Sequence, residues 1–164
     1  MARLIRTCGA DPAWLTLEIT ESCIVIDPVR TADTLLALRA LGVRVSVDDF
    51  GAGHASLGYL RRLPVDELKI DKSFVINMTV DKNDAAIVRS TISLAHDLCL
   101  TVCAEGVETA AAKNLLAAFG CDLVQVNHLG RPMPADAVGS RLHQKPAGEE
   151  DSGDVCAAQV LPGA

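Results

Sequence analysis

The chain has 164 residues, of which 49% are hydrophobic and 3% aromatic, a composition that favours one aliphatic α/β domain over a β-sandwich. Its formal net charge of −6 argues against a duplex nucleic-acid partner, and an anionic substrate would need bound cations. No apolar run approaches the roughly 20 residues of a membrane span, and no signal-peptide core is present. We therefore expect a cytoplasmic protein.

The elements expected in chain order alternate between strands and helices. After a helix end at residues 1–8, apolar alternation predicts strands at 15–20, 43–50, 67–71, 101–107 and 123–126. Helical spacing and end signals, with Asp27 and Thr109 as N-caps, predict helices at 28–41, 56–62, 84–98, 110–119 and 134–142. Five successive βα units imply an α/β fold with a parallel sheet and right-handed crossovers.

The composition changes near the C-terminus. After Gln144 the chain is rich in Gly, Glu, Asp and Ala. We expect one domain over residues 1–144 and a disordered tail over 145–164.

Six cysteines are present, and they show no paired zinc spacing. Most of them lie in apolar sequence. Buried, reduced thiols are the favoured interpretation and disulfides the alternative for Cys8, Cys23, Cys99, Cys103, Cys121 and Cys156.

The stretch at residues 43–57, VRVSVDDFGAGHASL, organises the rest of the chain. It begins as an alternating strand and ends in two adjacent carboxylates, Asp48 and Asp49. Because neighbouring strand residues point to opposite faces, one of the two should face inward at the carboxyl end of the strand, where α/β folds carry their ligand sites. Gly51 and Gly53 suit a shaped loop beside a ligand.

Each predicted strand offers a polar residue near its carboxyl end, on a consistent face: Glu18, Asp48, Lys69, Glu105 and Gln125, with Asp49 beside them. A single carboxylate at such a position is more often a solvated turn or a helix cap, but five polar ends of the same parity favour a site. Clustered carboxylates need a neutralising cation, and oxygen ligands suit Mg²⁺ or Mn²⁺. A lysine among them can hold a phosphate oxygen or a metal-bound water. The pattern therefore predicts metal-assisted phosphoryl chemistry.

An Asp-Phe-Gly triplet at residues 49–51 also occurs in protein kinases. The chain has no kinase-type glycine-rich loop, strand lysine or catalytic loop, and the kinase interpretation is rejected.

An ordered series of motifs carries a resemblance to a known family. The motifs are LEITES at 17–22, DDFGAGHASL at 48–57, LKIDKSF at 68–74, AEGVET at 104–109, and CDLVQ at 121–125 followed by GRPMPAD at 130–136. Over about residues 3–142 the chain resembles the EAL domain, the bacterial phosphodiesterase of cyclic di-GMP. The resemblance implies a partial TIM-type (β/α) barrel and hydrolysis of cyclic di-GMP to pGpG with two Mg²⁺ or Mn²⁺ ions.

Site roles follow from the resemblance by matching positions. Glu18 and Asp48 resemble metal ligands, and Asp49 a ligand of the second metal. Lys69 resembles the lysine that orients the attacking water. Glu105 resembles a metal-site carboxylate, and Gln125 resembles a site residue of a shared motif. Glu21 and Glu108 resemble two glutamates that support the site and its 48–56 loop.

The sequence also departs from the family pattern. The naming Glu-Ala-Leu motif and the asparagine ligand after it are absent, and five strands are predicted where a full barrel has eight in about 250 residues. Residues 126–128 read Val-Asn-His where the family has Gly-Tyr and a bulky residue. We therefore expect impaired activity in this chain alone, and a homo-oligomer or partner that closes the barrel. The alternative is an inactive module that binds cyclic di-GMP or a protein.

Overall fold

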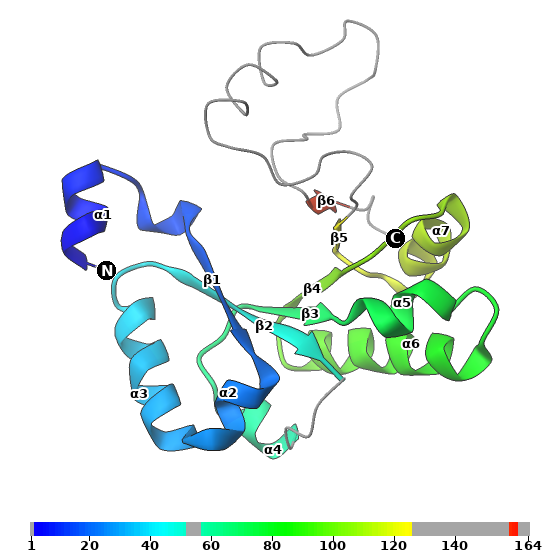
Figure 1. The fold of residues 1–164 in the computed structure, drawn as a ribbon, viewed down its shortest axis with the longest axis horizontal. Coiled ribbons are helices and arrows are strands. Elements are labelled where there is room, and N and C mark those ends of the chain that lie inside the picture. The colour runs from blue at the N-terminus through cyan, green and yellow to red at the C-terminus, as the bar shows by residue number, and fades with distance from the viewer. Residues whose placement is uncertain (1, 52–56, 126–157, 161–164) are drawn as a thin grey trace, which may run out of the picture.

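The protein is described by a computed structural model over residues 2–51, 57–125 and 158–160. A single sheet runs through it with the strands in sequence order (Figure 1). Five strands are parallel, as predicted: β1 Thr16–Thr20, β2 Arg44–Phe50, β3 Glu67–Ile70, β4 Thr101–Ala104 and β5 Leu123–Gln125. Consecutive parallel strands joined by helices are the arrangement of a TIM-type barrel, and the predicted α/β class is confirmed.

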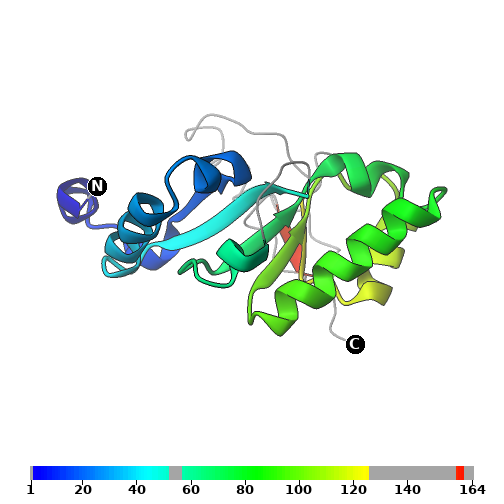
Figure 2. The same ribbon diagram turned by 90° about the horizontal axis from the view of Figure 1, so that it is seen from below.

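Helices connect the strands, and most of their ends follow the sequence signals. The bounds are α1 Ala2–Cys8, η1 Pro12–Trp14, α2 Glu21–Ile26, α3 Pro28–Arg39, α4 Leu57–Leu60, α5 Lys72–Asn77, α6 Lys82–Asp97 and α7 Ala110–Phe119. The predicted N-caps are confirmed, since the side chains of Asp27 and Thr109 accept hydrogen bonds from Arg30 N and Ala112 N. α3 packs against β2, and α6 lies against β3, β4 and α7 (Figure 2).

Two short helices were not predicted. α2 and α5 each begin directly after a strand, and both are shorter than two turns. Such pieces leave no helical periodicity in the sequence to detect. The predicted helix at 134–142 lies outside the described residues.

An aliphatic core fills the space between the sheet and the helices. Its fully buried members come mainly from the central strands and from α6, and include Val45, Val47, Leu68, Ile70, Val88, Ile92 and Val102. Alternate residues of β2 and β3 supply this face, which leaves the other face of the same strands free for the site.

Two aspartates pin the amino ends of the strands in the same way. Asp66, just before β3, accepts a hydrogen bond from Val45 N of β2 at 2.9 Å and pairs with Arg39 at the end of α3 at 3.1 Å. Asp122, just before β5, accepts from Val102 N of β4 at 2.8 Å and contacts His96 at the end of α6 at 2.9 Å. These contacts hold successive strands in register away from the site.

The predicted tail contains one short strand. Ala158–Val160, β6, lies within the range for which the sequence predicts a disordered tail and pairs antiparallel with β5. The rest of that tail lies outside the described residues.

The cysteines of the described residues are all free thiols, as predicted. Their predicted burial is wrong in part, because Cys8, Cys23 and Cys99 are exposed and Cys103 and Cys121 are buried. The exposed ones lie at the ends of helices or in α2, outside the core that the apolar neighbours in the sequence suggested.

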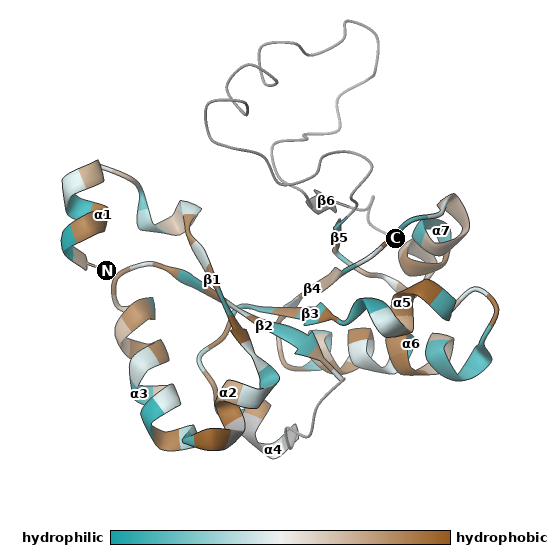
Figure 3. Ribbon diagram, viewed as in Figure 1, coloured by the Kyte–Doolittle hydropathy of each residue, from teal (hydrophilic) through white to brown (hydrophobic). Residues whose placement is uncertain are grey.

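The edge of the sheet at β1, opposite to β6, is open in the described structure. The residues of β1 alternate between half-buried and exposed, because the described structure has no strand beyond it. Large hydrophobic side chains are exposed nearby, with Trp14 at 82%, Ile26 at 83% and Val29 at 74%, and in Figure 3 the ribbon is coloured as hydrophobic where α2 meets α3. Within the described ranges no helix combines the length and apolar character that a membrane crossing needs.

Candidate active site

Lys69 stands at the centre of the site. Its side chain is 5% exposed, and its Nζ lies 2.8 Å from Glu18 Oε1, 3.2 Å from Asp48 Oδ1 and 2.5 Å from Glu105 Oε1. These partners come from β1, from β2 and from the residue after β4. The convergence predicted from strand parity is therefore confirmed for four of the five strand-end residues.

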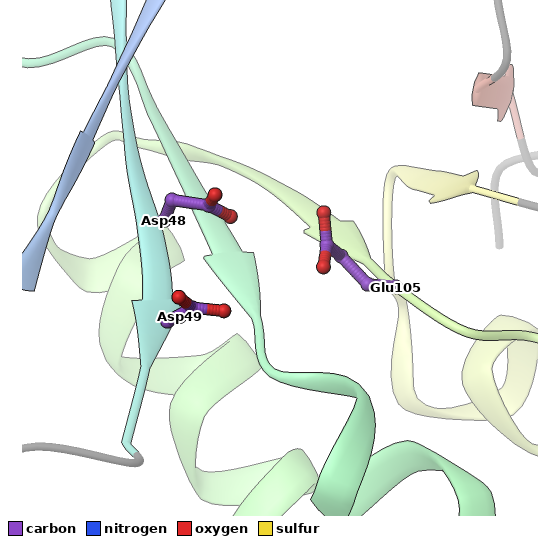
Figure 4. A group of neighbouring side chains, drawn as sticks. All are labelled: Asp48, Asp49 and Glu105. Carbon is purple, nitrogen blue, oxygen red and sulfur yellow. The ribbon is translucent and has the colours of Figure 1, made fainter. Parts of the chain in front are cut away.

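The pair Asp48 and Asp49 departs from simple alternation. Both carboxylates point from β2 toward Glu105 (Figure 4), whereas alternation predicted that only one would face inward. The register of β2 against β3 shifts between Val47 and Phe50, and Asp49 takes a left-handed φ of 54°. This bulge inserts one residue, so that Phe50 turns into the core and both aspartates face the site. A non-glycine residue in this conformation costs about 1–2 kcal/mol.

Three of the carboxylates are placed as a metal site would need them. One oxygen each from Asp48, Asp49 and Glu105 lie within 4.8 Å of one another. Asp48 Oδ1 is buried and lies 3.2 Å from Lys69 Nζ, but within the described part of the chain no hydrogen bond of acceptable geometry reaches it. A buried acceptor without a donor is costly, and a divalent cation would satisfy it. The donors are all hard oxygen atoms, which fit Mg²⁺ or Mn²⁺.

The charge balance of the site is negative. Burial alone would lower the pKa of Lys69, but hydrogen bonds to Glu105 and Glu18 and the charges around it outweigh this and raise the pKa above its ordinary value. The ammonium thus stays charged and neutralises part of the cluster. Three carboxylates, those of Glu18, Asp48 and Glu105, contact this ammonium. Two more, those of Asp49 and Asp71, add their negative charge to the cluster.

Asp71 is a site residue that the strand pattern did not single out. It follows β3 and caps α5, accepting a hydrogen bond from Ser73 N at 2.7 Å, and its charge contributes to the raised pKa of Asp49. Burial and the charge of Asp48 raise the pKa of Asp49, while the bonds from Ser73 outweigh burial and lower the pKa of Asp71. Its place two residues after Lys69 in the LKIDKSF motif was the signal available in the sequence.

Glu21 connects the site to the loop that follows β2. Its side chain is buried in the first turn of α2, and its Oε2 accepts a hydrogen bond from Gly51 N at 3.2 Å. Gly51 has a φ of 98°, and a Cβ there would lie 3.1 Å from the Phe74 ring, so glycine is needed for both reasons. The start of the loop is thereby fixed beside Asp48 and Asp49.

The other predicted residues are less directly placed. Gln125 lies half-buried on β5, and no hydrogen bond within the described residues joins its side chain to the Lys69 cluster. Glu108 is exposed just before α7. Gly53 lies outside the described residues.

The fold and the site define a parallel α/β protein of the barrel type with an acidic centre at the carboxyl ends of its strands. The chain belongs to the EAL domain family, whose sequence profile matches residues 1–132.

Two similar proteins carry names that state an activity. The bifunctional diguanylate cyclase/cyclic di-GMP phosphodiesterase MucR of Pseudomonas aeruginosa is 47% identical over 126 residues, which cover 77% of this chain and 18% of that protein. The cyclic di-GMP phosphodiesterase NbdA of the same organism is 41% identical over 134 residues, covering 82% of this chain and 17% of that protein. The chain thus spans about a fifth of the length of these curated relatives.

Solved structures share the fold. The MucR phosphodiesterase in complex with cyclic di-GMP superposes with a TM-score of 0.78 at 43% identity, over 83% of this chain and 55% of that one. The EAL domain of Mycobacterium smegmatis DcpA gives 0.81 at 39% identity, over 90% and 66%. A manganese and cyclic di-GMP complex of Klebsiella pneumoniae BlrP1 gives 0.70 at 32% identity, over 75% and 31%. These EAL domains are TIM-barrel-like, in agreement with the predicted fold.

Proposed function

We propose that this chain is part of an EAL-type phosphodiesterase that hydrolyses cyclic di-GMP to pGpG with a divalent cation, and that its activity is impaired when it acts alone. The observation that carries the proposal is the carboxylate group of Asp48, Asp49 and Glu105, held within 4.8 Å beside the buried Lys69.

The acidic cluster explains why a cation belongs to the function. A phosphodiester is an anion, and five carboxylates around one ammonium would repel it. A divalent cation held by Asp48, Asp49 and Glu105, with Glu18 beside them, would supply positive charge and Lewis acidity. Mg²⁺ and Mn²⁺ both suit this donor set.

The residues of the chain have distinct tasks in this proposal. Lys69 donates hydrogen bonds from a fixed ammonium, which orients the attacking water and keeps the carboxylates in place. Attack forms a bond from the water oxygen to phosphorus and breaks the bond to the ribose oxygen. The water gives its proton to a carboxylate of the cluster, and the ribose oxygen takes a proton from solvent and leaves as a hydroxyl group. Asp71 caps the start of α5 through its bond from Ser73 N, which fixes the backbone that follows Lys69. Glu21 holds the backbone at Gly51 beside the reacting group.

The substrate is proposed from the relatives together with the site. The matching MucR structure holds cyclic di-GMP, and two curated relatives are named for its hydrolysis. Gln125 and Glu108 border the same end of the sheet and stay proposed site residues.

A second chain or segment is proposed to complete the site. Among the described strands β1 has no outer neighbour, and exposed hydrophobic side chains flank this edge, an unstable arrangement for a parallel sheet. Further strands, from a second copy or a partner, would cover this edge and add ligands. The predicted cytoplasmic location stays a prediction.

The test is hydrolysis of cyclic di-GMP by the purified chain with Mn²⁺, followed as the appearance of pGpG. Glu18→Ala removes a carboxylate that contacts Lys69, and Asp33→Asn removes an exposed one on α3 as the matched control. The proposal predicts slow turnover that is lost in the first variant and kept in the second. A folded chain without turnover at any chain concentration would contradict the catalytic proposal.

A second candidate function is a module that binds cyclic di-GMP or a protein without turnover. The observation in its favour is that Lys69 already pairs with three carboxylates, so the cluster is partly neutralised without a metal. Binding of cyclic di-GMP that is equal with Mn²⁺ and with EDTA would favour this module.

A further inference from the structure

The two edges of the sheet differ. At one end β1 has no neighbour among the described strands, whereas at the other end β6 lies along β5 (Figure 1). β6 is antiparallel, which breaks the all-parallel pattern of β1 to β5. A barrel that continued beyond β5 would need a parallel strand at this position.

Every residue of β5 has a partner in β6. The register pairs Leu123 with Val160, Val124 with Gln159, and Gln125 with Ala158. Gln125 O accepts a hydrogen bond from Val107 N on the β4 side at 3.4 Å, and backbone groups alternate in direction along a strand, so the groups of β5 that face β6 are those of Val124. These are the groups that a further parallel strand would need, and β6 covers them.

We propose that Ala158–Val160 is a removable cap that closes the β5 edge of its own sheet and blocks the addition of any parallel strand there. The consequence for assembly rests on the proposed function, in which strands from another chain complete the site. Such strands can join the sheet at β1, and they can join at β5 only after β6 has left.

The length of β6 fits a removable element. Three residues are at the lower limit of strand length, so the pairing is weak. β6 belongs to the same chain as β5, so their pairing is intramolecular and is favoured over pairing with a strand of a second copy at low chain concentration.

Hydrogen–deuterium exchange of the full chain tests the cap. Backbone N–H groups of a strand alternate in direction, so Ala158→Pro with Val160→Pro, and Gln159→Pro alone, remove donors on opposite sides of β6. The proposal predicts that in one of these two variants the Val124 amide, which faces β6, exchanges at least tenfold faster, with the β2 and β3 amides unchanged. Unchanged β5 exchange in both variants would overturn it.

A strengthening variant covers the case in which proline unfolds the chain. Ala158→Val introduces a β-branched residue that favours a strand, and we expect slower exchange of the Val124 amide than in the parent chain. Equal exchange would overturn the cap. Light scattering adds a second readout. At chain concentrations of tens of micromolar, the variant that frees β5 should form more oligomer than the parent chain. Protection of β5 that is lost on dilution of the parent chain would show a strand supplied by a second copy, which also overturns the proposal. None of these readouts depends on hydrolysis.

Discussion

Lys69 Nζ lies 2.8 Å from Glu18 Oε1, and this ion pair joins β3 to β1 across the strand between them. The same ammonium contacts Asp48 of β2 and Glu105 beyond β4, so that one buried cation links four successive strands of the sheet. The Lys69 side chain thus holds these three carboxylates together and neutralises part of their negative charge.

Lys69→Met should destabilise the metal-free chain, because it leaves three carboxylates without their cation. Breaking a fully buried pair costs about 3–5 kcal/mol, and since the Glu18 side chain is 51% exposed we expect about 2 kcal/mol. Urea denaturation measures this loss. Millimolar Mn²⁺ should restore part of it, because the cation replaces the ammonium. Lys82→Met, an exposed residue of α6, is the control and should change little. An equal effect of both substitutions would contradict the role given to Lys69.

Glu21→Ala should loosen the loop after β2, because Gly51 N loses the acceptor at 3.2 Å. A hydrogen bond to a charged group contributes about 1.5–3 kcal/mol. Glu21→Gln keeps an oxygen acceptor and should have the smaller effect. The rate of hydrogen–deuterium exchange at the Gly51 amide should rise from the parent chain to Glu21→Gln and again to Glu21→Ala. Turnover is measured on the same three chains. The same order is expected for the loss of activity, and a Gln variant as damaged as Ala would argue against this hydrogen bond as the cause.

Gly106→Ala should displace Glu105, the neighbouring ligand candidate. Gly106 has a φ of 66°, and a Cβ there would lie 2.7 Å from Lys72 Cβ. Gly9→Ala is a matched control, because Gly9 has a φ of 64° and open space around it. Both variants carry the left-handed cost of about 1–2 kcal/mol. Any larger loss of stability in Gly106→Ala, measured by urea denaturation, reports the contact with Lys72. Equal losses would show that the contact relaxes freely.

The thiols should divide into two classes of reactivity. Burial raises the pKa of Cys121 to about 12 and raises that of Cys103 as well, so neither forms a thiolate at pH 8. Cys8, Cys23 and Cys99 are exposed and should react with a thiol reagent in the folded chain. Mass spectrometry of labelled peptides distinguishes them. Because the folded pKa values of the buried pair lie above the unfolded ones, their contribution to stability is complete below about pH 9 and is lost as the pH rises toward 12. Early labelling of Cys103 or Cys121 would contradict the buried placement.

Strand parity was enough to predict most of the site. Glu18, Asp48 and Lys69 converge because their strands were placed correctly and alternation fixes which side chains share a face. Glu105 joins them from the residue after β4, since the strand predicted at 101–107 ends at Ala104. Asp49 was placed beside them by its position in the sequence, but the bulge and the positive φ that turn it inward leave no mark on an alternating pattern.

Other features lay beyond what sequence patterns can show. The place of Asp71 depends on how α5 starts after β3, and β6 depends on a pairing between residues far apart in the sequence. Long-range contacts of this kind follow from the tertiary structure and not from local periodicity.

The central claim is that Asp48, Asp49 and Glu105 hold a divalent cation, and binding of Mn²⁺ to the purified chain tests it most directly. Electron paramagnetic resonance of free Mn²⁺ measures binding to the parent chain, to Asp48→Asn and to the exposed control Asp33→Asn. We expect the parent and Asp33→Asn to bind equally and Asp48→Asn to bind at least tenfold more weakly. Equal binding by all three chains, or none by a folded parent chain, would contradict the account.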